Sequence, residues 1–185
     1  LNNNLNSNAD FRRVEIDGPK ISQELSEKGL IAVSLALICM LIYIWFRFEW
    51  QFSVGAIFAL THDVFITIGV FSLLAYEFNL SIVAAVLTII GYSMNDTVVI
   101  YDRIRENLKK FDKKDLSILL NDSINETLPR TIKTSVTTLL ALISIYFFGG
   151  EILKGFSFAL IWGVIIGTYS SIFIATPILL YINLK

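Results

Sequence analysis

Chemically reactive side chains are scarce in this chain of 185 residues, which has one cysteine, one histidine and three prolines. The lone cysteine, Cys39, lies in an apolar stretch. It supports neither a disulfide framework nor a metal site, so we interpret it as a packing residue. The formal net charge is −1, which provides no electrostatic attraction for nucleic acid. We therefore expect no nucleic-acid partner, no metal and no bound cofactor.

Charge is scarce as well, at 17% of residues, whereas 55% are hydrophobic. The apolar residues form five stretches, at 29–46, 52–76, 80–101, 134–150 and 155–184. About 20 apolar residues in a helix cross the hydrocarbon core of a bilayer, and backbone groups in lipid must be satisfied within the segment. The sequence thus predicts an all-α integral membrane protein with five transmembrane helices in a domain at 29–185. The fourth helix is extended upstream to about 131, and the fifth is long enough to kink near Pro177.

Two segments lie outside these stretches, at 1–28 and about 113–128. The first begins with an Asn-rich run that we expect to be disordered, and it has too little apolar content to form a core alone. We interpret it as the C-terminal remnant of an extracytoplasmic α+β domain. The second has apolar residues at helical spacing, which predicts an amphipathic helix on the cytoplasmic surface. We expect Asp112 to cap this helix, and the helix to act as a brace.

Lysine and arginine are concentrated between the third and fourth predicted helices and are absent between the second and third. The positive-inside rule therefore places residues 102–133 and the C-terminus in the cytoplasm, and residues 1–28 in the periplasm. Four basic residues within 1–28 oppose this placement, but the rule tolerates them in an exported domain.

Asp96 is the only formally charged residue in the third stretch, and it is flanked by Asn95 and Thr97. An aspartate in a membrane helix costs roughly 2.5–3.5 kcal/mol on insertion scales, so it usually faces a bundle interior or a water-filled path. Two interpretations are open. Asp96 is either a structural residue hydrogen bonded to neighbouring helices or part of an ion or proton relay, with Asn95 and Thr97 as supporting polar groups.

The second stretch contains His62 and Asp63 near its centre. Gly55, Ala59 and Asp63 follow one another at four-residue spacing, which indicates that Asp63 faces protein rather than lipid. Histidine titrates near neutral pH when unperturbed, which suits proton transfer. The competing interpretation is a histidine that only bonds across a helix interface. An aspartyl protease dyad of Asp63 and Asp96 is a weaker alternative, because the rise per residue separates their depths by about 7 Å.

The fourth helix starts with a polar stripe in which Arg130, Thr134 and Thr137 share one face. In one interpretation Arg130 pairs with Asp96, because an arginine favours the ionised carboxylate while burial favours the neutral form. In the other, Arg130 extends to the membrane interface and the threonine hydroxyls bond to their own helix.

The fifth stretch has small residues at every fourth position, which lets helix backbones approach closely in lipid. We expect this small-residue ridge to pack against a sister helix. Its predicted packing residues are Gly155, Ala159, Gly163, Gly167 and Ser171.

The run GYSMNDTVVIYDRIREN at 91–107 closely resembles the fourth-helix signature of the SecF family of bacterial Sec accessory subunits, and NETLPRTIKTSVTT at 125–138 resembles the next signature. HDV at 62–64 and DGPK at 17–20 also match, so the resemblance covers nearly the whole chain. It implies helices two to six of a six-helix, proton-driven subunit of the RND superfamily. The family's first helix and most of its periplasmic domain would then be missing here.

The same resemblance implies that Asp96 and Arg130 couple proton flow to the export of proteins across the bacterial cytoplasmic (inner) membrane, without a covalent catalytic site. The implied partners are SecD, the SecYEG channel, unfolded preprotein and the lipid bilayer, with YajC as a further candidate. Two alternatives stay open beside this one. The chain could belong to an RND transporter of a small molecule or lipid, or it could be a passive scaffold of the translocon.

Overall fold

The computed structural model describes residues 19–75, 80–111 and 115–182. All its elements are helices: α1 (Pro19–Arg47), α2 (Trp50–Leu73), α3 (Leu80–Lys110), α4 (Leu116–Phe148), α5 (Glu151–Ser170), the π-helical η1 (Ser171–Ala175) and α6 (Thr176–Tyr181). Five spans are long and apolar enough to cross a membrane, the last made of α5, η1 and α6 together. The predicted all-α fold with five membrane helices is confirmed.

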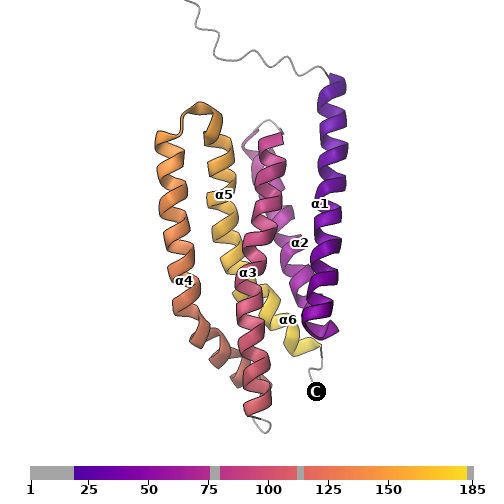
Figure 1. Cartoon of the computed structure of the whole chain (residues 1–185), viewed down its shortest axis with the longest axis vertical. Coiled ribbons are helices and arrows are strands. Elements are labelled where there is room, and N and C mark those ends of the chain that lie inside the picture. Colours follow the sequence, from indigo (N-terminus) through magenta and orange to yellow (C-terminus); the bar gives the residue numbers. More distant parts are fainter. Residues whose placement is uncertain (1–18, 76–79, 112–114, 183–185) are drawn as a thin grey trace, which may run out of the picture.

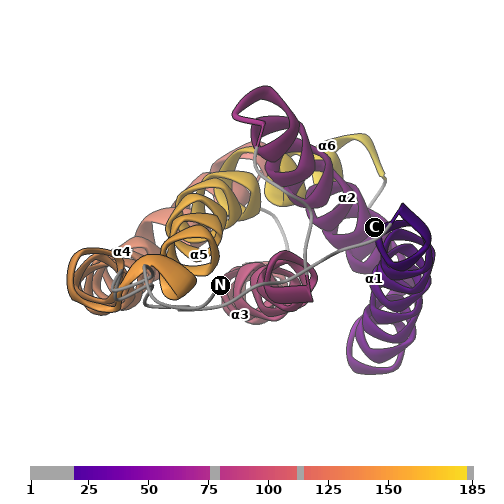
Figure 2. The same cartoon turned by 90° about the horizontal axis from the view of Figure 1, so that it is seen from above.

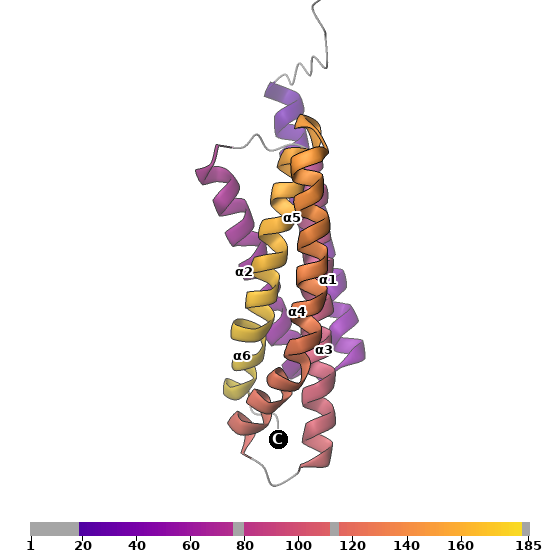
Figure 3. The same cartoon turned by 90° about the vertical axis from the view of Figure 1, so that its left-hand side faces the viewer.

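The helices form an elongated bundle with α3 between two pairs (Figures 1 and 2). On one side α3 packs against α4 and α5, and on the other against α1 and α2. Figure 3 shows α4 and α5 side by side along most of their length. Helices α1 and α4 are the most exposed of the five spans, because only 17% of the most apolar part of each is buried.

Helices α3 and α5 run in the same direction and approach closely through the small-residue ridge. A Cβ atom added to Gly163 would collide with Ile89, and one added to Gly167 would lie 2.9 Å from the Ser93 Cβ atom. Ala159 and Ser171 on the same ridge are fully buried. The sister helix against which the ridge packs is thus α3, which brings the polar residues of α3 and α5 into contact.

Helix α4 differs from the sequence-based expectation of a separate amphipathic helix at about 113–128. One helix runs from Leu116 to Phe148 with Pro129 inside it, and its lower part changes direction towards the end of α3 (Figure 1). A proline removes one hydrogen bond and bends a helix without always ending it. The cap is Asp115, whose carboxylate accepts from the Ser117 amide at 2.8 Å; Asp112 lies outside the described residues.

Other helices are longer than the sequence predicts, because polar residues continue them beyond their apolar parts. Helix α3 extends to Lys110 rather than ending near 101. Helix α1 begins at Pro19, so residues 19–28 belong to the same helix as the first span. Residues 1–18, on which the predicted domain remnant mainly rests, lie outside the described part of the chain.

The last span contains a π-helical turn, which lies directly before Pro177 in the first turn of α6. Proline supplies no backbone N–H, and single π-helical turns occur within α-helices frequently at functional sites. The span begins at Glu151 rather than at Gly155 because Gly150 adopts a positive φ of 76° and serves as the helix N-cap.

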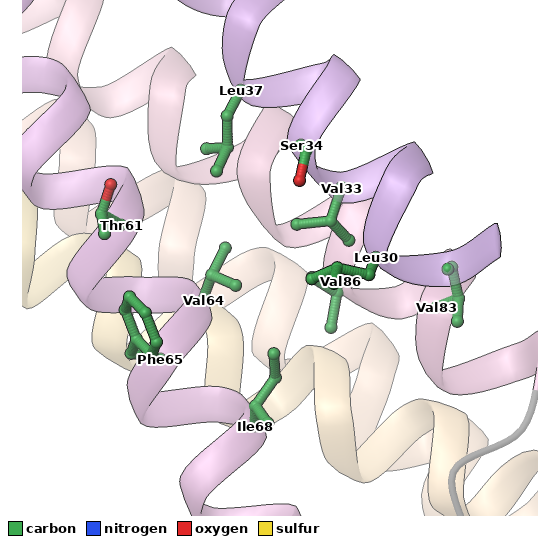
Figure 4. Close-up of a pocket in the computed structure, with 11 residues that line it drawn as sticks. Leu30, Val33, Ser34, Leu37, Thr61, Val64, Phe65, Ile68, Val83 and Val86 are labelled. Atoms are coloured by element: carbon green, nitrogen blue, oxygen red, sulfur yellow. The ribbon is translucent and has the colours of Figure 1, made fainter. Parts of the chain in front are cut away.

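An apolar groove separates part of α1 from α2 and α3. Its volume is about 400 Å³, and its walls include Val33, Val64 and Val86. Figure 4 shows these side chains with the hydroxyl groups of Ser34 and Thr61 at the same groove. Helix α1 therefore packs less closely on the bundle than α5 does.

Candidate functional site

Asp63 on α2 is fully buried and accepts hydrogen bonds from two other helices. The Ser93 hydroxyl on α3 donates to Asp63 Oδ2 at 2.6 Å, and the Ser170 hydroxyl at the end of α5 donates to the same atom at 2.7 Å. Close approach at Gly167 brings α5 against Ser93 on α3, and Gly55 lets α2 approach Tyr101 on α3 and Ala175 in η1. Asp63 thus faces protein, as its spacing from Gly55 and Ala59 predicts.

His62 connects this carboxyl group with the outside of the bundle. Its Nδ1 atom lies 3.1 Å from Asp63 Oδ1, and its side chain is 30% exposed. The imidazole lies beside the ring of Tyr169, with 6.5 Å between the ring centroids. Because a histidine nitrogen can donate or accept, the His62–Asp63 pair can hold a proton on either residue.

Asp96 on α3 is also buried, at 2% exposure, but it has a poorer set of partners. The Thr168 hydroxyl on α5 lies 3.4 Å from Asp96 Oδ2, which is long for a hydrogen bond. Thr168 in turn exchanges a 2.8 Å hydrogen bond with Ser135 on α4. A chain of hydroxyl groups therefore leads from Asp96 through α5 to α4.

Arg130 forms no ion pair with Asp96 among the described residues, so the direct pairing that the sequence suggests is absent in this structure. Arg130 is exposed, and its charge acts on Asp96 only through space. The threonine hydroxyls of the predicted polar stripe donate to backbone carbonyls of their own helix, α4. The hydroxyl of Thr134 donates to the Arg130 carbonyl at 3.2 Å, and that of Thr137 donates to the Lys133 carbonyl at 2.9 Å.

The two residues beside Asp96 have different surroundings. Thr97 is buried and shares a 2.9 Å hydrogen bond with the Ser171 hydroxyl, at the first residue of the π-helical turn. Asn95 is exposed on the opposite side of α3. No hydrogen bond joins the carboxyl groups of Asp63 and Asp96 within the described ranges, so the geometry gives no support to a protease dyad.

The hydroxyl partners of the two aspartates escaped the sequence analysis. Ser93, Thr168 and Ser170 lie in mainly apolar stretches, and Ser135 lies beside the polar stripe of the fourth helix. The available signal was their spacing, because a hydroxyl every three or four residues beside a small-residue ridge marks a protein-facing side.

A further network of charged residues joins α3 and α4 where the helices extend past their apolar parts. Arg103 donates to Glu126 and, at 2.6 Å, to Glu106. The Asn107 amide donates to the Ser123 hydroxyl at 3.0 Å. These contacts fit a brace rather than a proton site, because their charged groups are exposed. Among the described residues, no group of acidic, histidine and cysteine side chains could hold a metal ion.

Comparison with known proteins identifies the family. The family model described as "Protein export membrane protein SecD/SecF, C-terminal" matches residues 1–185. The chain belongs to the SecD/SecF family. Protein translocase subunit SecF of Rickettsia bellii is 53% identical over 179 residues, which is 97% of this chain and 59% of the relative. SecF of Cereibacter sphaeroides is 53% identical over 173 residues, covering 94% of this chain and 53% of the relative.

Solved structures agree with this family assignment. The crystal structure of SecDF, a translocon-associated membrane protein from Thermus thermophilus, superposes with a TM-score of 0.85 at 44% identity, over 91% of this chain and 23% of that chain. A SecDF crystal structure in a super-membrane-facing form gives a TM-score of 0.77 at 42% identity, over 90% of this chain and 22% of that chain. This SecD/SecF chain is a bacterial membrane protein that spans little more than half the length of the SecF relatives named above.

Proposed function

We propose that this chain is the membrane part of a SecF subunit that uses the proton-motive force to promote preprotein translocation across the bacterial cytoplasmic membrane. Its family supports this assignment, because the matched relatives are named protein translocase subunit SecF. The coupling ion is the proton, and the chain has no covalent catalytic role. Residues 102–133 and the C-terminus face the cytoplasm, as the distribution of lysine and arginine suggests.

The observation that carries the proposal is that the carboxyl group of buried Asp96 has few hydrogen-bond partners. A buried carboxylate is stable when several donors or a positive charge compensate it. Asp96 has one long contact from Thr168 and no ion pair in the described structure. A change in the position of the Arg130 charge would therefore change the preference of Asp96 between its neutral and ionised forms. This sensitivity is what a proton relay requires.

A SecD-type partner is proposed to pack on the exposed side of α3, next to the helix that carries Asp96. Figure 2 shows α3 at the edge of the bundle, between α4 and α1. Gly91 and Asn95 are exposed on this side, and a Cβ atom added to Gly91 would meet open space. A small residue and an amide are common at helix–helix contacts in membranes. SecYEG and unfolded preprotein are the further proposed partners, with YajC as an additional candidate.

The test replaces Asp96 in the full-length subunit assembled with SecD. We expect Asp96→Asn to abolish the part of preprotein export that depends on the proton gradient, measured in membrane vesicles. The matched control is Asp102→Asn, which removes an exposed carboxylate on the same helix that pairs with Arg47. Unchanged gradient-dependent export in Asp96→Asn would contradict the relay. A scaffold would be indicated if Arg130→Met also retained export.

A further inference from the structure

The hydrogen bonds around Asp63 fit two protonation states rather than one. Both serine hydroxyls donate to Oδ2, and His62 contacts Oδ1. These three contacts suit an ionised carboxylate. Ser170 also has a second acceptor, because its hydroxyl lies 3.1 Å from the Gly167 carbonyl oxygen.

That second acceptor allows a proton to be added without leaving a polar group unpaired. If Asp63 Oδ2 carries the proton, its O–H can donate to the Ser170 oxygen. The Ser170 hydroxyl then donates to Gly167 instead, while Ser93 still donates to a lone pair of Oδ2. A permanently ionised carboxylate would not need this second acceptor for Ser170. A carboxyl group that takes up a proton does need it, because an unpaired buried hydroxyl would destabilise the site.

The charged and titratable groups around Asp63 are few. On α2 the adjacent group is His62, and on α5 the phenol-bearing ring of Tyr169 contacts the imidazole. On α3, Asp96 lies one turn beyond Ser93 and contacts Thr168 instead. The part of α1 that faces α2 across the groove is apolar apart from Ser34, and η1 and α6 contribute no acidic or basic side chain. Among the described residues, His62 is thus the one basic side chain that contacts Asp63.

The exposed edge of His62 supplies a way for a proton to enter and leave. The neighbouring rings of Tyr169 and Phe173 are 50% and 61% exposed, so His62 lies at the outer surface of the bundle. A proton on the imidazole can pass from Nδ1 to Asp63 Oδ1, which leaves a neutral imidazole and a neutral carboxylic acid. Rotation of the carboxyl group about its Cβ–Cγ bond then exchanges the two oxygens and brings the protonated one to Ser170. The reverse step restores the carboxylate and the imidazolium.

We propose that His62 and Asp63 form a second proton-binding site, separate from Asp96, in which Ser170 switches between Asp63 and the Gly167 carbonyl as the proton arrives. Ser170 directly precedes the π-helical turn, so the switch acts on the segment that also holds Thr97 through Ser171. The site does not depend on the relay role of Asp96.

The test is infrared difference spectroscopy of the full-length subunit with SecD in liposomes, titrated from acid to alkaline pH. A protonated carboxylic acid and a carboxylate absorb at different frequencies. We expect a pH-dependent carboxylic acid band that Asp63→Asn removes and Asp96→Asn retains. His62→Gln should shift the midpoint of this band, because the carboxyl group loses the neighbour with which it exchanges the proton.

Two further variants keep the carboxyl group and remain informative if Asp63→Asn fails to fold. Ser170→Ala should shift both the frequency and the midpoint of the band, because it removes a donor to the carboxylate. Thr67→Val is the matched control and should leave the band unchanged. Thr67 is fully buried on the same face of α2, and its hydroxyl has no partner among the described residues.

Three results would overturn the proposal. The first is the absence of a titrating band assigned to Asp63. The second is a band that His62→Gln leaves in place. The third is a band whose midpoint pH changes with the sodium concentration, which would indicate a metal cation in place of the proton. A failure of the Asp96 relay leaves all three measurements intact, so the two proposals are tested separately.

Discussion

The two buried aspartates differ in how well the fold compensates them. Asp63 lies where three helices meet and receives two short hydroxyl contacts and one from histidine. Asp96, three residues past Ser93 on α3, has a single contact of 3.4 Å. The partners of Asp63 hold three helices together and, through the second acceptor of Ser170, also accommodate a proton. Asp96, with one long contact, responds to any charge that approaches it. Equal burial therefore does not imply an equal role.

The largest expected effect is the difference in stability between a variant that lacks the Asp63 carboxyl group and one that lacks the Asp96 carboxyl group. Asp63→Ala removes the acceptor that the Ser93 and Ser170 hydroxyls share, although Ser170 keeps the Gly167 carbonyl, and should destabilise the bundle by about 2–3 kcal/mol. Asp96→Ala should cost less than about 1 kcal/mol in the isolated chain, because it orphans one weak donor. Unfolding in mixed detergent micelles, followed by circular dichroism, would measure both. Equal losses would remove the proposed distinction.

A second test of the comparison disturbs the close contact between α5 and α3 that positions Ser93. Gly167→Val adds side-chain atoms where a Cβ atom already meets the Ser93 Cβ at 2.9 Å and its Cα at 3.3 Å. We expect destabilisation by about 1–3 kcal/mol from overpacking and a weaker Asp63–Ser93 contact. The control is Gly69→Ala, because a Cβ atom at Gly69 has no neighbour within 4 Å. A neutral Gly167→Val would show that the helices can separate without cost.

The smallest expected effects come from the hydroxyl partners themselves. Ser170→Ala should reduce the free energy of unfolding by about 1 kcal/mol, in the range of membrane-embedded hydrogen bonds. Thr168→Val should change it by about half of that or less, since its contact with Asp96 is long. If Thr168→Val proved the more damaging variant, Asp96 would be better held than the distances indicate. Both values follow from the same unfolding measurement.

The sequence predicted the helices more accurately than their ends. Apolar length fixed five spans because a bilayer crossing requires it. The ends depended on polar segments such as 102–110, which continue α3 past its apolar part. The expected separation of a helix at about 113–128 from the fourth span falls at Pro129, which lies inside α4. Contacts with α3 support this helix on both sides of the proline, from Asn107 to Ser123 and from Tyr92 to Thr138.

For the candidate site, the sequence pointed to the two carboxyl groups and His62 but left two interpretations of Arg130 open. Arg130 and Asp96 suggested a pair because both lie towards the same end of consecutive helices. In the structure Arg130 is exposed, and the threonines of its stripe bond to their own helix. Spacing along one helix fixes which side chains share a face, but not which helix that face meets.

The sequence by itself determined the membrane helices, the buried carboxyl groups and the small-residue ridge that brings two helices together. Only the tertiary structure decided that Ser93 and Ser170, the latter 107 residues from Asp63, bind one carboxyl group while Asp96 is left with Thr168. The physical reason is the register between α3 and α5. It arises from close packing at Gly163 and Gly167, and a shift by one turn would move Ser170 away from Asp63 and Thr168 away from Asp96.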